Sequence, residues 1–246
     1  MKIMVTNDDG INSQGLSTLT DALRSIAEVW AVAPDREMSA VSHSLTLHKP
    51  LRAKEIAPKY YSVNGTPTDC VNLGVNSILK TKPDLIVSGI NKGGNLGDDI
   101  VYSGTVAAAR EGTMLGIPSF AISLVAEKDF KFQTAAIFAV RLAEHLLKNK
   151  LPKGTFLNIN VPNTEIEGTF PYRITRQGKR FHGGSIVEKV DPRGEKYYWF
   201  GNNDLGFEEI KDSDSHAIAQ NCISVTPLRL ELTDYSFLEE LSTWVL

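Results

Sequence analysis

Two adjacent acidic residues, Asp8 and Asp9, follow the first apolar run of the chain, residues 2–7. A helix-like stretch comes next, so the pair stands between a predicted strand and a predicted helix. In an open α/β sheet, ligands bind at the carboxyl ends of the strands. Two carboxylates there offer hard oxygen ligands to a divalent cation, and a cation can hold a phosphate. The alternative is a plain turn with Asp9 as a helix cap; the neighbouring polar loops favour the metal site.

Each of the next three predicted strands is also followed by a polar loop. These loops are Pro34-Asp35-Arg36-Glu37-Met38-Ser39, Asn64-Gly65-Thr66-Pro67-Thr68-Asp69 and Ser88-Gly89-Ile90-Asn91-Lys92-Gly93-Gly94-Asn95. If the strands are parallel, all four loops rise from one edge of the sheet. The Ser39 hydroxyl and the Asn91 amide oxygen could then complete the shell of a hard cation, together with water and substrate oxygens. Either residue alone is more simply a capping serine or a turn asparagine, so the hypothesis depends on their convergence.

A second informative stretch begins at residues 93–97, which are rich in glycine, and ends in a predicted helix. Small residues let the backbone approach a ligand closely. A helix N-terminus offers free N–H groups and a positive dipole end to a phosphate. Ser103 and Thr105 stand at this helix start and are candidates for phosphate contact, with a simply capped helix as the alternative. Asp98 and Asp99 are assigned no direct contact, because like charges repel phosphate.

Motifs that are absent narrow the function further. The first strand–helix turn has no G-x-G-x-x-G sequence, and G-x-x-x-x-G-K-[ST] occurs nowhere in the chain. Their absence argues against a nicotinamide enzyme and against a P-loop ATPase. Two histidines, His43 and His48, fall in the loop after Ser39. Either could be a general acid for a leaving oxygen, although a surface position is the more common role for a loop histidine.

The alternation of two apolar periods along the chain predicts the fold class. Short runs rich in Val and Ile predict buried strands at residues 2–7, 28–34, 60–64, 84–89, 119–124 and 156–161. A helical spacing of apolar residues predicts helices at residues 16–27, 68–80, 105–115 and 133–148. Strands that alternate with helices form a mostly parallel sheet with right-handed crossovers. We therefore expect an α/β fold.

The pattern changes toward the C-terminus. The predicted elements are strand-like runs at residues 172–181 and 185–201 with a turn at 190–194, a short helix at 214–221, a strand at 222–230 and a terminal helix at 235–245. The turn between strand-like runs predicts a β-hairpin. The terminal helix is too short to be stable alone, so it must pack on its own core or on a neighbouring subunit. We expect a catalytic core at residues 1–171 and an extension at 172–246.

Composition places the chain among ordinary globular proteins. Its 246 residues suit one α/β domain or a domain with an appendage, and 42% of them are hydrophobic and 22% charged. A net charge of −3 gives no basic field for a nucleic-acid backbone. A small anionic substrate remains compatible with this charge, because a metal can supply local positive charge.

The cysteines and the hydropathy indicate a cytoplasmic protein. Cys70 and Cys222 are the only cysteines, too few for a disulfide framework or a zinc cluster, and we expect both to be reduced. No signal-peptide pattern precedes the first strand, and no apolar run approaches the roughly 20 residues that span a bilayer. We expect a soluble, intracellular protein with neither a nucleic-acid polymer nor a membrane as partner.

Several motifs in combination resemble the SurE family of stationary-phase survival proteins, which are nucleotidases. They are Asn7-Asp8-Asp9-Gly10 with Gly15, Ala33-Pro34-Asp35-Arg36 with Ser39, Asn64-Gly65-Thr66-Pro67-Thr68-Asp69-Cys70-Val71, Ser88-Gly89-Ile90-Asn91-Lys92-Gly93-Gly94-Asn95, Tyr102-Ser103-Gly104-Thr105-Val106-Ala107-Ala108-Ala109-Arg110-Glu111 and Ser224-Val225-Thr226-Pro227-Leu228. The resemblance spans about residues 2–230. The combination is far more specific than any single motif.

The resemblance implies a metal-dependent phosphomonoesterase that dephosphorylates nucleoside 5′- and 3′-monophosphates. It implies one divalent metal ion per subunit, Mg²⁺ or Mn²⁺, held by Asp8, Asp9, Ser39 and Asn91, and a phosphate site lined by Asn95, Ser103 and Thr105. It further implies a Rossmann-like, three-layer core in a homodimer or homotetramer whose subunits exchange the hairpin and a C-terminal segment. Ala40 departs from the family, which commonly has glycine there; this could stiffen the loop but removes no ligand.

The mechanistic hypothesis is metal-assisted hydrolysis in which a metal-bound water attacks the phosphorus. Asp8 is the alternative nucleophile, although a carboxylate engaged as a metal ligand is a poorer one. Two other classes of function stay open at this point. One is a non-catalytic module that senses a nucleotide or a metal, and the other is a metal-dependent transferase that uses a nucleotide sugar.

Overall fold

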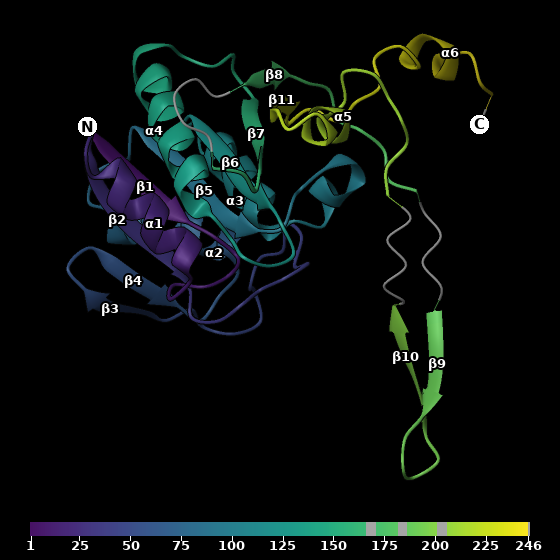
Figure 1. Ribbon diagram of the computed structural model, residues 1–246, viewed down its shortest axis with the longest axis horizontal. Coiled ribbons are helices and arrows are strands. Elements are labelled where there is room, and N and C mark those ends of the chain that lie inside the picture. Colours follow the sequence, from purple (N-terminus) through teal and green to yellow (C-terminus); the bar gives the residue numbers. More distant parts are fainter. Residues whose placement is uncertain (166–170, 182–185, 201–205, 246) are drawn as a thin grey trace.

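The computed structural model describes residues 1–165, 171–181, 186–200 and 206–245. Its elements are β1 (Lys2–Thr6), α1 (Gln14–Leu23), β2 (Glu28–Pro34), β3 (Ala53–Ala57), β4 (Tyr60–Val63), α2 (Pro67–Leu73), the π-helical turn η1 (Gly74–Ile78), β5 (Leu85–Lys92), the 3-10 turn η2 (Gly97–Val101), α3 (Gly104–Met114), β6 (Ser119–Val125), α4 (Phe132–Lys148), β7 (Thr155–Pro162), β8 (Tyr172–Ile174), β9 (Ile186–Val190), β10 (Lys196–Phe200), α5 (Asp214–Ala219), β11 (Ile223–Arg229) and α6 (Leu238–Ser242). Helices cover both faces of a central sheet (Figure 1), so the predicted three-layer α/β architecture is confirmed.

The central sheet has nine strands in the order β3-β4-β2-β1-β5-β6-β7-β11-β8. Strands β4, β2, β1, β5, β6 and β7 are parallel to their neighbours in this series. The chain moves outward from β1 to β2 and β4, returns to β5, and then moves the other way through β6 and β7. The strand order therefore reverses between β1 and β5. In folds of this kind, ligands bind in the crevice at that point.

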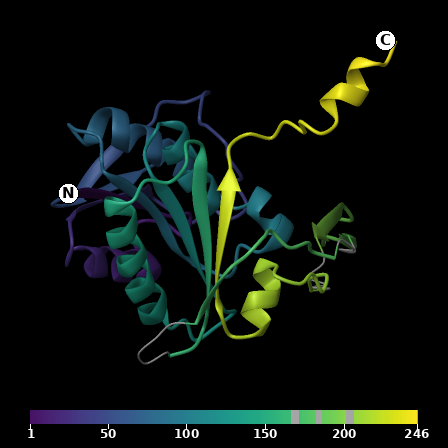
Figure 2. The same cartoon turned by 90° about the horizontal axis from the view of Figure 1, so that it is seen from above.

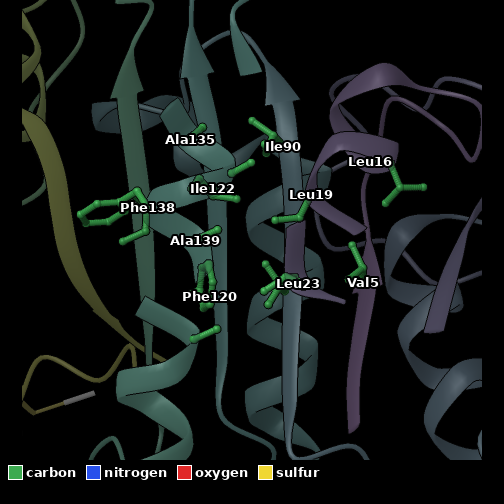
Figure 3. Packing of buried hydrophobic residues seen from close by; sticks show 14 of the residues in the cluster. Val5, Leu16, Leu19, Leu23, Ile90, Phe120, Ile122, Ala135, Phe138 and Ala139 are labelled. Carbon is green, nitrogen blue, oxygen red and sulfur yellow. The ribbon is translucent and has the colours of Figure 1, made fainter. Parts of the chain in front are cut away.

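Helices α1 and α4 cover one face of the sheet and enclose the larger core (Figure 3). The side chains of Leu16, Leu19 and Leu23 on α1 have no exposed surface, as their spacing of three and four residues predicts for one helix face. Ser13 begins this helix, because its side-chain oxygen accepts the N–H of Leu16. The predicted helix at residues 16–27 therefore starts two residues earlier and ends at Leu23.

Helices α2 and α3 cover the opposite face and enclose a second core. Met4 and Ile86 project from β1 and β5 into this core, where they meet Val71 and Cys70 of α2. Burial raises the pKa of the Cys70 thiol well above its usual value, so this cysteine behaves as a small apolar side chain. The two cysteines are both free thiols, as expected. Among the described residues, no helix is both long and apolar enough to cross a bilayer.

Some predicted elements differ from the structure. The helix expected at 68–80 is α-helical only to Leu73 and continues as the π-helical turn η1. Strand β3 was not predicted, because all of its side chains are exposed and it carries no apolar alternation. Of the strand-like run 172–181, only Tyr172–Ile174 is a strand. Strands β3 and β8 are exposed edge strands, so they are placed by pairing with the sheet and not by a pattern of burial.

The predicted hairpin forms from β9 and β10, which pair antiparallel around the turn at 191–195; residues 185 and 201 of this run lie outside the described residues. The hairpin and the short terminal helix α6 both lie away from the body of the molecule (Figures 1 and 2). Aromatic side chains of the hairpin and of the residues after α6 are exposed, with Trp199 at 64%, Phe200 at 93% and Trp244 at 52%. Exposed apolar surface of this kind indicates an interaction site.

The division of the chain at residue 171 stays a prediction. Strands β8 and β11 both follow this point and both belong to the central sheet. Strand β11 pairs antiparallel with β7 over six residue pairs, and β8 pairs with β11. Residues after 171 therefore complete the sheet as well as forming the hairpin.

Gly15 allows α1 to approach the backbone of β5 directly. A Cβ atom at this position would lie 2.0 Å from the carbonyl oxygen of Ile90, a backbone atom that cannot rotate away. We expect Gly15→Ala to lower the free energy of unfolding by about 1–3 kcal/mol or more, because α1 must move off the sheet. Urea unfolding measures this change. Ser17→Ala, on the exposed face of the same helix, is the control and should change stability by less than about 0.5 kcal/mol; equal stability of the two variants would contradict the packing argument.

Candidate active site

A polar cavity of about 320 Å³ lies at the carboxyl ends of β1 and β5, where the strand order reverses. It is lined by Asp8, Asp9, Glu37, Ser39, Ala40, Asn91, Lys92, Gly94, Asn95, Asp99, Tyr102 and Ser103. The loops after β1 and β2, the last residues of β5 and the segment between β5 and α3 supply these residues. The cavity brings together six of the seven site residues predicted from the sequence. The seventh, Thr105, is fully buried and lies behind Asp8.

A larger cavity of about 580 Å³ lies elsewhere, between α4 and strands β8 and β11. Its lining is mostly apolar and includes Phe138, Leu142, Leu146 and Val225. It has no paired carboxylates, so it offers no chemistry comparable to that of the polar cavity. We therefore take the smaller cavity as the candidate active site.

The turn after β1 is closed by Asn7. Its side-chain Nδ2 donates to the Gly10 carbonyl oxygen (3.1 Å) and to the Ser13 hydroxyl (2.7 Å). Gly10 has a φ of +95°, a backbone conformation that glycine adopts readily and other residues avoid. The turn therefore leaves regular strand geometry directly after β1. Adjacent strand side chains point to opposite faces, and the turn removes this constraint, so that Asp8 and Asp9 both line the cavity.

The N-terminus of α3 holds the Asp8 carboxylate. The backbone N–H of Thr105 donates to Asp8 Oδ2 (3.0 Å), and the Thr105 hydroxyl donates to Oδ1 (2.6 Å). Ser103 caps the same helix by accepting the N–H of Val106 (3.1 Å). A negative group is stabilised at a helix N-terminus. In this protein that group is the Asp8 side chain, and Thr105 contacts Asp8 and does not line the cavity.

The surroundings of the two carboxylates raise the pKa of each of them. Burial raises the pKa of Asp8, and the hydrogen bonds from Thr105 oppose this shift. Burial and then the charge of Asp8 raise the pKa of Asp9 to about 6, although the backbone N–H of Lys92 donates to Asp9 Oδ2 (3.1 Å). Two ionised carboxylates in one small cavity are unfavourable unless a positive charge joins them.

Ser39 and Asn91 add oxygen ligands to the same cavity. Ser39 Oγ donates to Glu37 Oε1 (2.6 Å) and keeps its lone pairs for a ligand. Asn91 Nδ2 donates to the Gly93 carbonyl oxygen (2.9 Å), so the amide oxygen is the atom that can bind a cation. Strand β5 bulges between Ser88 and Asn91, and bulges near sites re-aim side chains.

The chemistry of this donor set fits a hard divalent cation. Two carboxylates, a hydroxyl and an amide oxygen are the ligands that Mg²⁺ and similar ions prefer. Within the part of the chain that the structure describes, no three His, Cys, Asp or Glu side chains gather as a possible metal cluster. A site rich in nitrogen or sulfur, as zinc would need, is therefore not found among those residues.

Asn95 is fixed by two asparagines of β7 that the sequence analysis missed. Its backbone N–H donates to Asn160 Oδ1 (2.8 Å), and its carbonyl oxygen accepts from Asn158 Nδ2 (2.8 Å) and Asn160 Nδ2 (3.0 Å). The Asn95 side chain donates to Ser123 Oγ (2.7 Å). Alternating asparagines inside an otherwise apolar strand were the available signal, because buried amides need partners.

The other end of the same loop is tied to the C-terminal part of the chain, which the sequence analysis also missed. Asp214 is fully buried and accepts the backbone N–H of Gly97 (2.9 Å) and of Gly178 (3.0 Å). Burial raises its pKa. Arg180 forms a salt bridge with Asp99 at the cavity wall. These contacts join segments far apart in sequence, and local patterns do not detect them.

The two loop histidines lie outside the cavity lining. His43 Nε2 lies 2.7 Å from Glu111 Oε2 on α3, and His48 is exposed. The geometry therefore gives neither histidine a contact with the cavity as a general acid. Ala40, in contrast, lines the cavity and has a φ of +54°. This left-handed conformation costs about 1–2 kcal/mol for a residue with a Cβ atom, which is the physical reason that glycine suits the position.

Known proteins are similar to this chain along most or all of its length. A family model described as survival protein SurE matches residues 3–183. A 5′-nucleotidase SurE from Geotalea uraniireducens is 55% identical over 245 residues, which cover 99% of each chain. A 5′-nucleotidase SurE from Pelobacter propionicus is 54% identical over 246 residues, which cover 100% of each chain. The crystal structure of a SurE protein from Aquifex aeolicus matches with a TM-score of 0.89 at 41% identity and covers 98% of each chain. This chain therefore belongs to the SurE family.

Proposed function

We propose that this chain is a metal-dependent 5′-nucleotidase, a phosphomonoesterase that hydrolyses nucleoside 5′- and 3′-monophosphates to nucleoside and phosphate. The observation that carries the proposal is the Asp8–Asp9 pair in a cavity lined by oxygen ligands at the switch point of the sheet. The names of the relatives from Geotalea and Pelobacter support the same activity. They also favour a hydrolase over a binding module without turnover and over a sugar transferase.

We propose Asp8, Asp9, Ser39 and Asn91 as the ligands of one Mg²⁺ or Mn²⁺ ion per subunit. The fit rests on the oxygen-only donor set and on the burial of Asp9 beside the charge of Asp8, which together raise the pKa of Asp9 to about 6. When bound, such a cation supplies charge neutralisation and Lewis acidity toward a phosphoryl oxygen. The protein side supplies a rigid frame, because α3 holds Asp8 and β5 holds Asn91.

The remaining polar residues suit the phosphate. Ser103 uses its oxygen as the helix cap and has its hydroxyl hydrogen left to donate. Asn95 has one of its two amide hydrogens engaged with Ser123, and the other can donate toward the cavity. Lys92 adds a positive charge to the lining. Preorganised donors of this kind stabilise charge on the equatorial oxygens of a transferring phosphoryl group.

Water is the nucleophile in this proposal. Both carboxylate oxygens of Asp8 accept hydrogen bonds from Thr105, which lowers their nucleophilicity. A labelled substrate would leave a phospho-enzyme if Asp8, or any other side chain of the protein, attacked phosphorus, whereas attack by water would leave none. Rapid quenching followed by acid gel analysis of the protein distinguishes the two routes, and a stable labelled band would overturn the choice of water.

The exposed aromatic side chains of the hairpin, together with exposed Leu238, Leu241 and Trp244 in and after α6, support assembly into a homodimer or homotetramer. An isolated two-stranded hairpin is marginally stable in water, and every residue of β9 and β10 is exposed in the single chain. A partner subunit would bury this surface. Free thiols at Cys70 and Cys222 support a cytoplasmic location, where thiols stay reduced.

The first test is phosphate release from nucleoside monophosphates with chelator and with added Mn²⁺ or Mg²⁺. Wild type should release phosphate only with metal. Asp8→Asn and Asp9→Asn should each lower kcat/KM by at least about 100-fold, because each removes a charged ligand whose partners cannot replace it. Circular dichroism controls for folding. Near-normal turnover in either variant, or no release by folded wild type with any metal, would overturn the assignment.

Thr105 has a distinct role in this proposal, because it orients Asp8 without reaching the cavity. We expect Thr105→Val to lower kcat/KM by about 10- to 100-fold, as loss of a partner that orients a metal ligand typically does. The matched control is Thr113→Val on the same helix, whose hydroxyl donates to the Ala109 carbonyl oxygen far from the cavity. Steady-state kinetics of the two variants at saturating metal measure the difference, and equal activities would remove Thr105 from the site.

A further inference from the structure

The loop that carries Ser39 is long and has no helix or strand of its own. It runs from residue 35 to residue 52, between β2 and β3, and we call it the Ser39 loop. Two of its residues that are not glycine, Ala40 and Ser42, both have a φ of +54°. Residues held in this region are strained and keep the conformation only when surrounding contacts impose it. The position of Ser39 in the cavity therefore depends on what anchors the loop.

One side-chain anchor is the contact between His43 of the loop and Glu111 of α3. His43 Nε2 lies 2.7 Å from Glu111 Oε2, and the two side chains are only 24% and 10% exposed. Asn72 Nδ2 donates to the other oxygen, Glu111 Oε1 (2.6 Å). The hydrogen bond from His43 is the main cause that lowers the pKa of Glu111. A carboxylate with both oxygens engaged and little exposure is a rigid point of attachment.

Backbone N–H groups continue the attachment on either side of His43. Ser42 N–H donates to the Tyr102 carbonyl oxygen (2.9 Å), and Thr46 N–H donates to Asp69 Oδ1 (2.9 Å). On the other side of Ser39, Met38 N–H donates to the Asp8 carbonyl oxygen (2.8 Å). Ser39 is therefore bracketed by an anchor to the β1 turn and an anchor to α3.

Two of the proposed metal ligands, Asp8 and Ser39, are anchored to the same helix, α3. Thr105, at the start of α3, holds Asp8, and Glu111, further along α3, holds the Ser39 loop through His43. A ligand set drawn from several loops keeps its geometry only if the loops are fixed to a common frame. Helix α3 provides this frame for Asp8 and Ser39.

We propose that His43 is a positioning residue of the nucleotidase, one that pins the Ser39 loop to α3 through Glu111 and so keeps Ser39 in the cavity that Asp8 also lines. The proposal rests on the proposed function, and it assigns to His43 no contact with substrate. Its Nε2 is engaged with Glu111, and His43 is not among the residues that line the cavity.

The test compares His43→Ala with His43→Gln, in which the side-chain amide can still donate to Glu111. The control is His48→Ala, an exposed histidine of the same loop. Titration calorimetry of the full-length, metal-free protein with Mn²⁺ should give an affinity about 10- to 100-fold weaker in His43→Ala, the usual effect of losing a partner that orients a ligand. His43→Gln should recover most of the affinity, and His48→Ala should match wild type.

Kinetics with a nucleoside monophosphate separate positioning from acid catalysis. Positioning predicts that His43→Ala needs more Mn²⁺ for half-maximal rate while kcat at saturating Mn²⁺ falls less than about threefold, because the chemical groups remain. A kcat loss that saturating Mn²⁺ does not restore, together with loss of one limb of the pH profile, would identify His43 as a general acid and overturn the proposal.

Hydrogen exchange tests, independently of any activity, whether His43 anchors the Ser39 loop to α3. In His43→Ala, the amides of Ser42 and Thr46 should exchange faster than in wild type, while those of α4 should not change. His43→Gln should restore protection. Unchanged exchange in the Ser39 loop of His43→Ala would overturn the anchoring role of His43. If wild type released no phosphate with any metal, the proposed function would fail, whereas the exchange result would still decide whether His43 anchors the loop.

Discussion

Two carboxylates in one small, partly buried cavity are the constraint on which the rest of the structure depends. Asp8 and Asp9 lose hydration there and repel each other, and the pKa of Asp9 rises to about 6 as a result. The protein offsets part of this penalty with N–H groups, from Thr105 toward Asp8 and from Lys92 toward Asp9. The remaining negative charge is what a divalent cation would balance, so electrostatics and proposed chemistry lead to the same requirement.

Helix α3 gives Asp8 a fixed position, because the helix packs tightly against the sheet. A Cβ atom at Gly112 would lie 2.4 Å from the Ser119 hydroxyl and 2.9 Å from the Ile86 side chain, so the helix packs at close range on β5 and β6. Asp8 takes its orientation from the first turn of this helix. The cavity is therefore rigid where α3 defines it and depends on anchored loops elsewhere.

Sequence reasoning reached the parts of the site that local pattern encodes. The six parallel strands had buried apolar runs, and the polar residues after β1, β2 and β5 met because parallel strands share an edge. It did not reach residues whose role is set by tertiary contact. Asn158 and Asn160 form hydrogen bonds with Asn95 from another strand of the sheet. All side chains of β3 are exposed, so its sequence shows no alternation of apolar and polar residues. Thr105 was correctly placed at a helix start, but what that helix start faces is an acidic side chain of this same chain.

Hydrogen bonds between distant residues also cross the predicted end of the core at residue 171. A change in sequence pattern suggested a division at residue 171, yet hydrogen bonds cross it at the site itself. The buried carboxylate of Asp214 holds the backbone of Gly97, and Gln177 Nε2 donates to the Gly97 carbonyl oxygen (3.1 Å). A chain cut at residue 171 would leave this loop backbone without those partners and β7 without β11, and unpaired backbone groups are costly when buried. The C-terminal part is thus joined to the cavity wall by bonds that sequence pattern does not encode, and it carries the exposed hairpin as well.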